Sequence, residues 1–168
     1  MSTVAYKDGI MVCDTAMGCD DELFNGIIKA GRTKKYLFGF AGRTSQMLPL
    51  FDWILENEDH EDWRSPEDSY KFTENMQTNG TDVGSAMLVD KNGSIWEVTS
   101  EGFCIPIPRY AHAIGCGATY ALGAMEAGVG AENAVRIAGK FDAFTNQTTF
   151  VFEHDDSEMI LRPYAIRS

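Results

Sequence analysis

Short apolar stretches separated by turn residues dominate the start of the chain. Thr3 to Tyr6 is rich in β-prone residues, Asp8-Gly9 is a strong turn signal, and Ile10 to Cys13 is a second such stretch. We therefore predict a β-hairpin over residues 3–13. Further along, the apolar run from Tyr36 to Gly42 predicts a strand that is buried on both faces and ends in glycine.

Helical spacing replaces this pattern after residue 43. A helix from about Thr44 is predicted by apolar residues at i, i+1, i+4, i+7 and i+8, namely Met47, Leu48, Phe51, Ile54 and Leu55. Residues 66–76 are compatible with one short helix. Two further helices are predicted at 118–126 and 131–144, and the second carries Glu132 in its first turn, where a carboxylate interacts favourably with the helix dipole.

Strand signals return between and after these helices. Strands are predicted at 86–90, 94–99, 103–107 and 112–116, and a last hairpin at 148–153 and 159–162 around Asp155-Asp156. Residues 15–32 are rich in small and polar residues, with only Ile27-Ile28 as an apolar stretch. No repeat or linker is evident, so residues 1–168 are predicted to form one domain. Sequential hairpins with two separate helical regions predict two antiparallel sheets packed together, with helices on both outer faces.

Composition narrows the classes of partner. The chain has 14 basic and 25 acidic residues, a net charge of −11, which argues against nucleic acid or an anionic membrane as the main partner. No apolar run approaches 18 residues and no signal peptide is evident, so no membrane association is expected. Four cysteines without a C-x-x-C pair suit reduced thiols in the cytoplasm. The three histidines lack metal-ligand spacing, so we predict neither a metal site nor a cofactor.

The first residues carry candidate chemistry of their own. Removal of Met1 would leave Ser2 with both a hydroxyl and a free α-amine. An α-amine has an ordinary pKa near 7.7–8.0, so a sizeable fraction is neutral at pH 7. Such an amine can act as the general base that a serine hydroxyl needs to become a nucleophile.

Several short motifs in order resemble proteasome β-type subunits, in particular the bacterial ring protease HslV and its phage or bacterial relatives. The motifs are residues 2–9 with Asp14, then Gly39-Phe40-Ala41-Gly42, then Ile114 to Gly117 leading into residues 120–124, and finally residues 131–138 followed by Asp142. The resemblance implies an α+β fold, a four-layer αββα sandwich of two antiparallel sheets flanked by helices, of the N-terminal-nucleophile hydrolase type. Members of this family cut peptide bonds with the first residue of the mature chain, inside a ring-shaped chamber.

The resemblance also implies residue roles. Ser2 stands where the family has its catalytic threonine, and Asp14 matches an aspartate that holds a charged partner beside it. Gly42 matches the glycine whose N–H faces the developing oxyanion. Phe40 and Thr44 flank Gly42 and are candidates for shaping a substrate pocket.

Three positions depart from the family pattern. Serine replaces threonine at position 2, and Cys116 stands where the family usually has a serine that assists proton transfer, supported by the aspartate matched by Asp142. Aligning Ile27-Ile28 to the family places Gly26 at the position of its catalytic lysine. Lys29 lies three residues later, an odd offset that on a strand would reverse the direction of the side chain.

Three functions are compatible with these observations. The leading hypothesis is a self-assembling peptidase that hydrolyses polypeptides with Ser2, as a homo-oligomeric ring and with an ATPase unfoldase as a further partner that the sequence does not decide. The departures at the site also suit a catalytically weak or inactive proteasome-like assembly or binding protein. The third hypothesis is an amidohydrolase acting on a small amide, because a fold does not determine its substrate.

Overall fold

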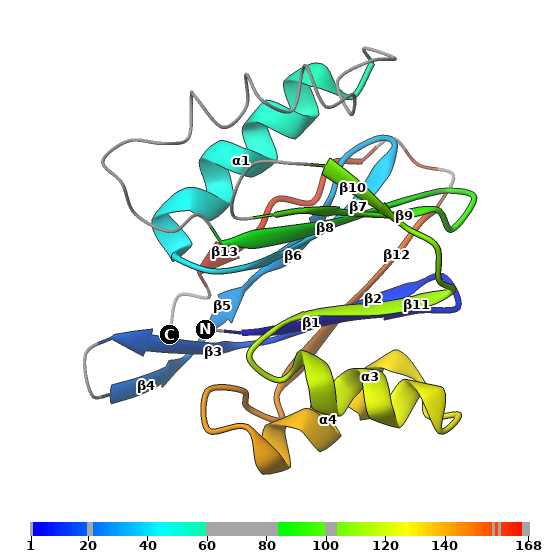
Figure 1. Cartoon of the computed structure of the whole chain (residues 1–168). Coiled ribbons are helices and arrows are strands. Elements are labelled where there is room, and N and C mark those ends of the chain that lie inside the picture. The colour runs from blue at the N-terminus through cyan, green and yellow to red at the C-terminus, as the bar shows by residue number, and fades with distance from the viewer. Residues whose placement is uncertain are drawn as a thin grey trace.

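Two antiparallel sheets pack face to face in the structure, a computed structural model that describes residues 2–19, 22–59, 84–99, 104–155, 157 and 159–165 (Figure 1). The first sheet has the order β11-β1-β2-β12. Its strands are β1 (Thr3–Lys7), β2 (Ile10–Asp14), β11 (Ala111–Gly115) and β12 (Thr149–Glu153). The predicted first hairpin is confirmed, because β1 and β2 pair around Asp8 and Gly9, whose φ angles of 52° and 82° suit a tight two-residue turn.

The second sheet has five strands in the order β10-β9-β8-β7-β6. These strands are β6 (Ala30–Arg32), β7 (Tyr36–Ala41), β8 (Ser85–Asp90), β9 (Ile95–Val98) and β10 (Cys104–Ile107). Two small ribbons complete the β-structure. In one, β3 (Ala16–Cys19) pairs with β4 (Glu22–Asn25), and in the other, β5 (Ile27–Ile28) pairs with β13 (Tyr164–Ala165).

Helices cover the outer face of each sheet, which confirms the predicted four-layer α+β architecture (Figure 1). Helix α1 (Thr44–Asn57) lies on the five-stranded sheet, and helices α3 (Ala118–Glu126) and α4 (Ala131–Phe141) lie on the four-stranded sheet. Helix α4 ends three residues earlier than predicted. None of these three helices, which are those of the described residues, is long and apolar enough to cross a membrane.

Strand alternation distributes the side chains between the layers. On β1, Val4 and Tyr6 pack into the core between the sheets, whereas Ala5 packs against α3 and α4. On β7, Leu37 faces the same central core, and Phe38 packs edge-to-face on Phe51 of α1 with ring centroids 5.3 Å apart. Strand β7 is therefore buried on both faces, as the sequence predicts.

The predicted final hairpin is wrong. Strand β12 pairs with β2, and the described part of the returning segment makes one bridge, between Leu161 and Arg32, before β13 pairs with β5. The reason is the buried Arg32, whose guanidinium donates to the carbonyls of Glu153 and Met159 and pairs with Asp155 at 2.8 Å. These contacts hold Glu153, Asp155 and Met159 at the end of β6 instead of in a turn between two paired strands.

Two other segments complete the comparison with the predicted elements. Residues 15–32, where the sequence shows only a short apolar stretch, form the four strands β3 to β6. The predicted helix at 66–76 lies outside the described residues.

Candidate active site

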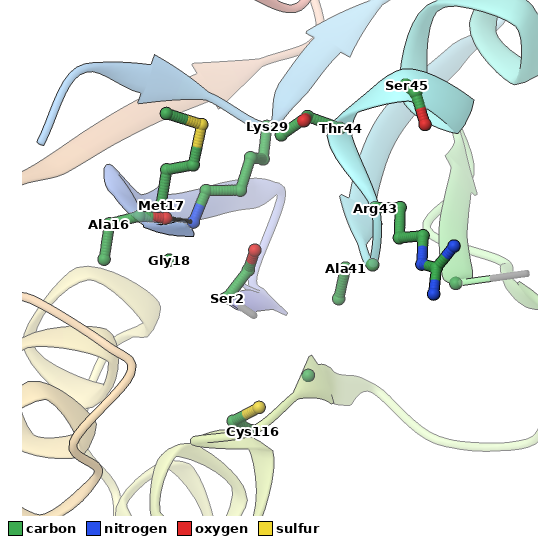
Figure 2. A pocket seen from close by; sticks show the side chains of 13 residues that line it. Ser2, Ala16, Met17, Gly18, Lys29, Ala41, Arg43, Thr44, Ser45 and Cys116 are labelled. Atoms are coloured by element: carbon green, nitrogen blue, oxygen red, sulfur yellow. Dashed lines mark hydrogen bonds between the residues drawn. The ribbon is translucent and has the colours of Figure 1, made fainter. Parts of the chain in front are cut away.

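A cavity of about 800 Å³ opens where the ends of several strands meet (Figure 2). Its walls come from the residue that precedes β1, from β3, from the break between β5 and β6, from the end of β7 with the start of α1, and from the end of β11. The lining residues are Ser2, Ala16, Met17, Gly18, Lys29, Ala41, Gly42, Arg43, Thr44, Ser45, Gly84, Gly115 and Cys116. Segments far apart in the sequence are thus brought together around Ser2.

Ser2 is held by its backbone and left unpaired at its side chain. Its carbonyl accepts a 2.8 Å hydrogen bond from the N–H of Cys116, which ties the start of β1 to the end of β11. Only 1% of the residue is exposed, and among the described residues its Oγ has no hydrogen-bond partner. A buried hydroxyl without a partner is uncommon in a folded protein and points to a functional position.

Lys29 and Asp14 form a buried ion pair beside Ser2. The Lys29 Nζ lies 3.0 Å from Asp14 Oδ1, with the side chains 2% and 0% exposed, and it also donates to the carbonyl of Ala16. The Asp14 carboxylate accepts further hydrogen bonds from the N–H groups of Thr3 at 2.8 Å, Ala16 at 3.0 Å and Asn146 at 3.2 Å. The ammonium group is therefore fixed at the cavity wall, with the same aspartate tied to the residue that follows Ser2.

The placement of Gly26 at the lysine position of the family is wrong. Lys29 lies between β5, which ends at Ile28, and β6, which begins at Ala30. It lines the cavity, and its carbonyl accepts a 2.8 Å hydrogen bond from the N–H of Phe40 on β7. Its neighbours Ile28 and Ala30 both pack in the core between the sheets, so strand alternation turns the Lys29 side chain away from that core. Gly26 instead occupies a turn after β4, with φ 122° and its N–H bonded to the carbonyl of Thr15. The sequence signal for Lys29 was its position directly after Ile27-Ile28, the one apolar stretch of residues 15–32.

Glycines allow the close backbone approaches that shape the cavity. A Cβ at Gly42 would lie 2.4 Å from the Cα of Gly84, so β7 and the start of β8 meet there backbone to backbone. A Cβ at Gly115 would lie 1.9 Å from the carbonyl oxygen of Ser2, and its φ of 96° also favours glycine. Both glycines line the cavity, and Gly115 is required for the hydrogen bond that positions Ser2.

The two pocket residues suggested by the sequence separate in the structure. Thr44 lines the cavity at the start of α1, whereas Phe40 is 1% exposed and packs in the core beneath α1. Phe40 and Ala41 point to opposite faces of β7, and it is Ala41 that reaches the cavity. The ring of Phe40 instead packs against the backbone of Gly42, since its Cζ lies 3.1 Å from the position that a Cβ on Gly42 would take.

Cys116 and Asp142 do not form the pair that the sequence suggests. Cys116 is exposed and lies across the cavity from Ser2 in Figure 2. Asp142 accepts a hydrogen bond from the hydroxyl of Thr145, which is 2.6 Å from the hydroxyl of Thr3. Because the one proton of Thr145 goes to Asp142, the hydroxyl of Thr3 donates to Thr145 and accepts from the N–H of Gly117 at 3.0 Å. Asp142 therefore reaches the site through Thr145 and Thr3.

Metal and thiol chemistry are limited in the described part of the chain. No group of three or more His, Cys, Asp or Glu side chains is placed there to hold a metal ion. Burial on β2 raises the pKa of the Cys13 thiol to about 12, which keeps that thiol protonated and inert. Cys116 is the thiol that faces the cavity.

Comparison with solved structures identifies the fold, whereas comparison of the sequence finds no match. No protein-family model matches the sequence, and no curated protein matches it. Eukaryotic HslV from Trypanosoma brucei superimposes with a TM-score of 0.71 at 21% identity, over 91% of this chain and 99% of HslV. Thiobacillus denitrificans BPH in complex with Epoxomicin gives a TM-score of 0.62 at 20% identity, over 90% and 97% of the two chains. A second structure of BPH gives 0.59 at 19% identity, over 93% and 99%. The chain therefore has the fold of HslV and BPH.

Proposed function

We propose that this chain is an N-terminal-nucleophile peptidase that hydrolyses peptide bonds of polypeptides, with Ser2 as the nucleophile once Met1 is removed. The observation that carries the proposal is the buried, unpartnered Oγ of Ser2 in an open cavity, beside the fixed Lys29–Asp14 pair. The fold shared with HslV and BPH supports the same assignment.

The chemistry needs one protein group that moves a proton and two that stabilise charge. The free α-amine of Ser2 takes the proton of its own hydroxyl while Oγ attacks the carbonyl carbon of the substrate. The C–N bond then breaks, the departing amine receives that proton, and the remaining acyl ester on Ser2 is hydrolysed by water. Gly42 supplies a backbone N–H for the oxyanion, a contribution of about 2.7–4 kcal/mol per donor, and the ammonium of Lys29 adds positive charge.

Lys29 strengthens the case for an enzyme over an inactive assembly protein. One of the three departures from the family pattern, the lack of a lysine at the site, no longer stands. Lys29 lines the cavity wall and is paired with Asp14. Serine supplies the same attacking oxygen as threonine. Cys116 remains the one substitution that changes a donor at the site, and its thiol is not part of the Thr3–Thr145–Asp142 chain.

Assembly and location are part of the same proposal. The resemblance to proteasome β-type subunits, which act inside a ring-shaped chamber, and the fold shared with HslV and BPH support a homo-oligomeric ring for this chain. In such a chamber, folded substrates would need an ATPase unfoldase, whereas unstructured polypeptides would enter alone. The reduced thiols of Cys13 and Cys116 suit the cytoplasm. Native mass spectrometry measures the oligomeric state directly, and a monomer at micromolar concentration would contradict the ring.

The deciding experiment combines intact mass with a peptide epoxyketone such as epoxomicin, which needs a hydroxyl and an α-amine on one residue. We expect purified protein to lack Met1 and to form a one-to-one adduct on Ser2. Ser2→Ala should abolish both the adduct and the cleavage of unfolded polypeptide. Ser45→Ala removes another serine of the same cavity and should still give the adduct on Ser2. Quantitative retention of Met1 would exclude this mechanism and leave the assembly or binding function.

A further inference from the structure

The described part of the cavity wall carries charge of one sign. Of its 13 lining residues only Lys29 and Arg43 are charged, and both are cations, although the whole chain has a net charge of −11. Lys29 forms an ion pair with Asp14 at 3.0 Å, so the two together carry no net charge. The net positive charge at this wall therefore comes from Arg43.

Arg43 has no partner for its guanidinium among the described residues. Three other arginines of the chain do: Arg32 pairs with Asp155, Arg136 with Glu132 and Arg162 with Asp52. Arg43 is exposed, and Figure 2 shows its side chain on the opposite side of Ser2 and Ala41 from Lys29. The guanidinium has five donors, and no acceptor among the described residues is bonded to them.

The start of helix α1 adds to this positive character. Arg43 is the N-cap of α1, no side chain caps the helix, and no acidic residue lies in the first turn. The free N–H groups of a 14-residue helix carry partial positive charge at this end. The start of α1 and Ser2 line the same cavity. The buried, unpartnered Oγ of Ser2 is independent evidence that this cavity binds a ligand.

We propose that Arg43 is a specificity-determining residue, and that it selects polypeptides with an acidic side chain within two residues of the bond that is cut. The inference rests on the proposed function and adds the substrate class. Arg43 directly follows Gly42, the residue assigned to the carbonyl under attack. Residues of an extended peptide are about 3.3–3.6 Å apart, so a long side chain rooted next to Gly42 reaches about two residues along a bound substrate.

The first experiment compares matched peptides. For one peptide that the enzyme cuts at a mapped bond, each of the two residues on either side is replaced in turn by Glu and, in a paired peptide, by Gln. We expect kcat/KM to favour Glu over Gln by about five- to tenfold at one or two of these positions, as for a hydrogen-bonded charge pair. The preference should fall to about twofold or less in 1 M NaCl, where the screening length is about 3 Å.

Variants assign the preference to Arg43. Arg43→Gln should bring the Glu/Gln ratio close to 1, and Arg43→Lys should restore part of it. Arg109→Gln is the control. Arg109 is an exposed cation that precedes β11, at the end of the strand opposite to Gly115, and in this variant the Glu/Gln ratio should stay at its wild-type value. A ratio below two at all four positions, or one that Arg43→Gln leaves unchanged, would overturn the proposal.

A binding measurement separates this proposal from the proposed function. Fluorescein-labelled hexapeptides that differ only by Glu or Gln at one position are titrated into Ser2→Ala and into Ser2→Ala/Arg43→Gln. Tighter binding of the Glu peptide to the first protein alone supports charge selection, even if the wild-type enzyme cuts nothing and peptidase activity is excluded. Equal binding of both peptides to Ser2→Ala overturns charge selection, whatever the activity of the wild-type enzyme.

Discussion

The cavity contains two cations in opposite circumstances. Lys29 is 2% exposed, and its ammonium is fixed by Asp14 and by the carbonyl of Ala16. Arg43 is exposed at the start of α1 and has no partner among the described residues. A buried charge is tolerated only when it is paired, whereas an exposed charge keeps its water until a ligand replaces it. The buried cation can therefore take part in the chemistry at a fixed point, and the exposed one can distinguish substrates.

Lys29→Met tests the buried side of this comparison and has the largest expected effect. It leaves Asp14 as a buried carboxylate without its cation, so we expect the free energy of unfolding to fall by about 3–5 kcal/mol. Peptide hydrolysis should fall at least about 10²-fold, because positive charge next to Ser2 is lost. Urea unfolding and peptide cleavage at a temperature where the variant is folded measure the two effects.

A double variant separates folding from chemistry. Lys29→Met/Asp14→Asn removes both charges, and we expect it to recover part of the lost stability but none of the lost activity. Wild-type stability in Lys29→Met alone would mean that Asp14 is sufficiently stabilised by the N–H groups of Thr3, Ala16 and Asn146. The Lys29–Asp14 pair would then not be what distinguishes this side of the cavity.

Thr145→Val sharpens the same comparison with an uncharged chain of hydrogen bonds. It keeps the shape of a buried side chain but leaves the Thr3 hydroxyl and the Asp142 carboxylate without their shared partner. We expect a loss of about 1–3 kcal/mol in the free energy of unfolding. Thr145→Ser keeps the hydroxyl and should lose less than half as much. Equal losses in the two variants would assign the effect to packing of the methyl group.

Local signals predicted the parts of the fold that local contacts build. The Asp8-Gly9 turn, the apolar run of β7 and the helical spacing of α1 each determine an element from within a few residues. The prediction of a final hairpin is wrong because Arg32 determines where this segment lies, and the partners of Arg32 are more than 120 residues away in the sequence. No pattern in residues 153–162 contains that information.

The sequence motifs predicted which backbone positions lie at the site. They predicted less well which way the side chains at those positions point. Ser2, Gly42, Thr44 and Cys116 all line the cavity. Phe40 points into the core by strand alternation. Lys29 lines the cavity, which an offset counted from Gly26 does not predict because Gly26 lies in a turn before β5. Asp142 acts through Thr145, a residue that the motifs do not include.

Arg43→Gln tests the exposed side and has the smallest expected effect on stability. Removing a cation from the N-cap of α1 relieves an unfavourable interaction with the positive end of the helix, a gain of up to about 0.3–1 kcal/mol at low salt. It also makes the net charge of the chain more negative, from −11 to −12, which costs a similar small amount through self-repulsion. We therefore expect the free energy of unfolding to stay within about 0.5 kcal/mol of wild type, as for other exposed positions. Urea unfolding in 50 mM and 500 mM NaCl measures it, and a loss above 1 kcal/mol would mean that Arg43 stabilises the fold, so that the two cations differ in burial but not in function.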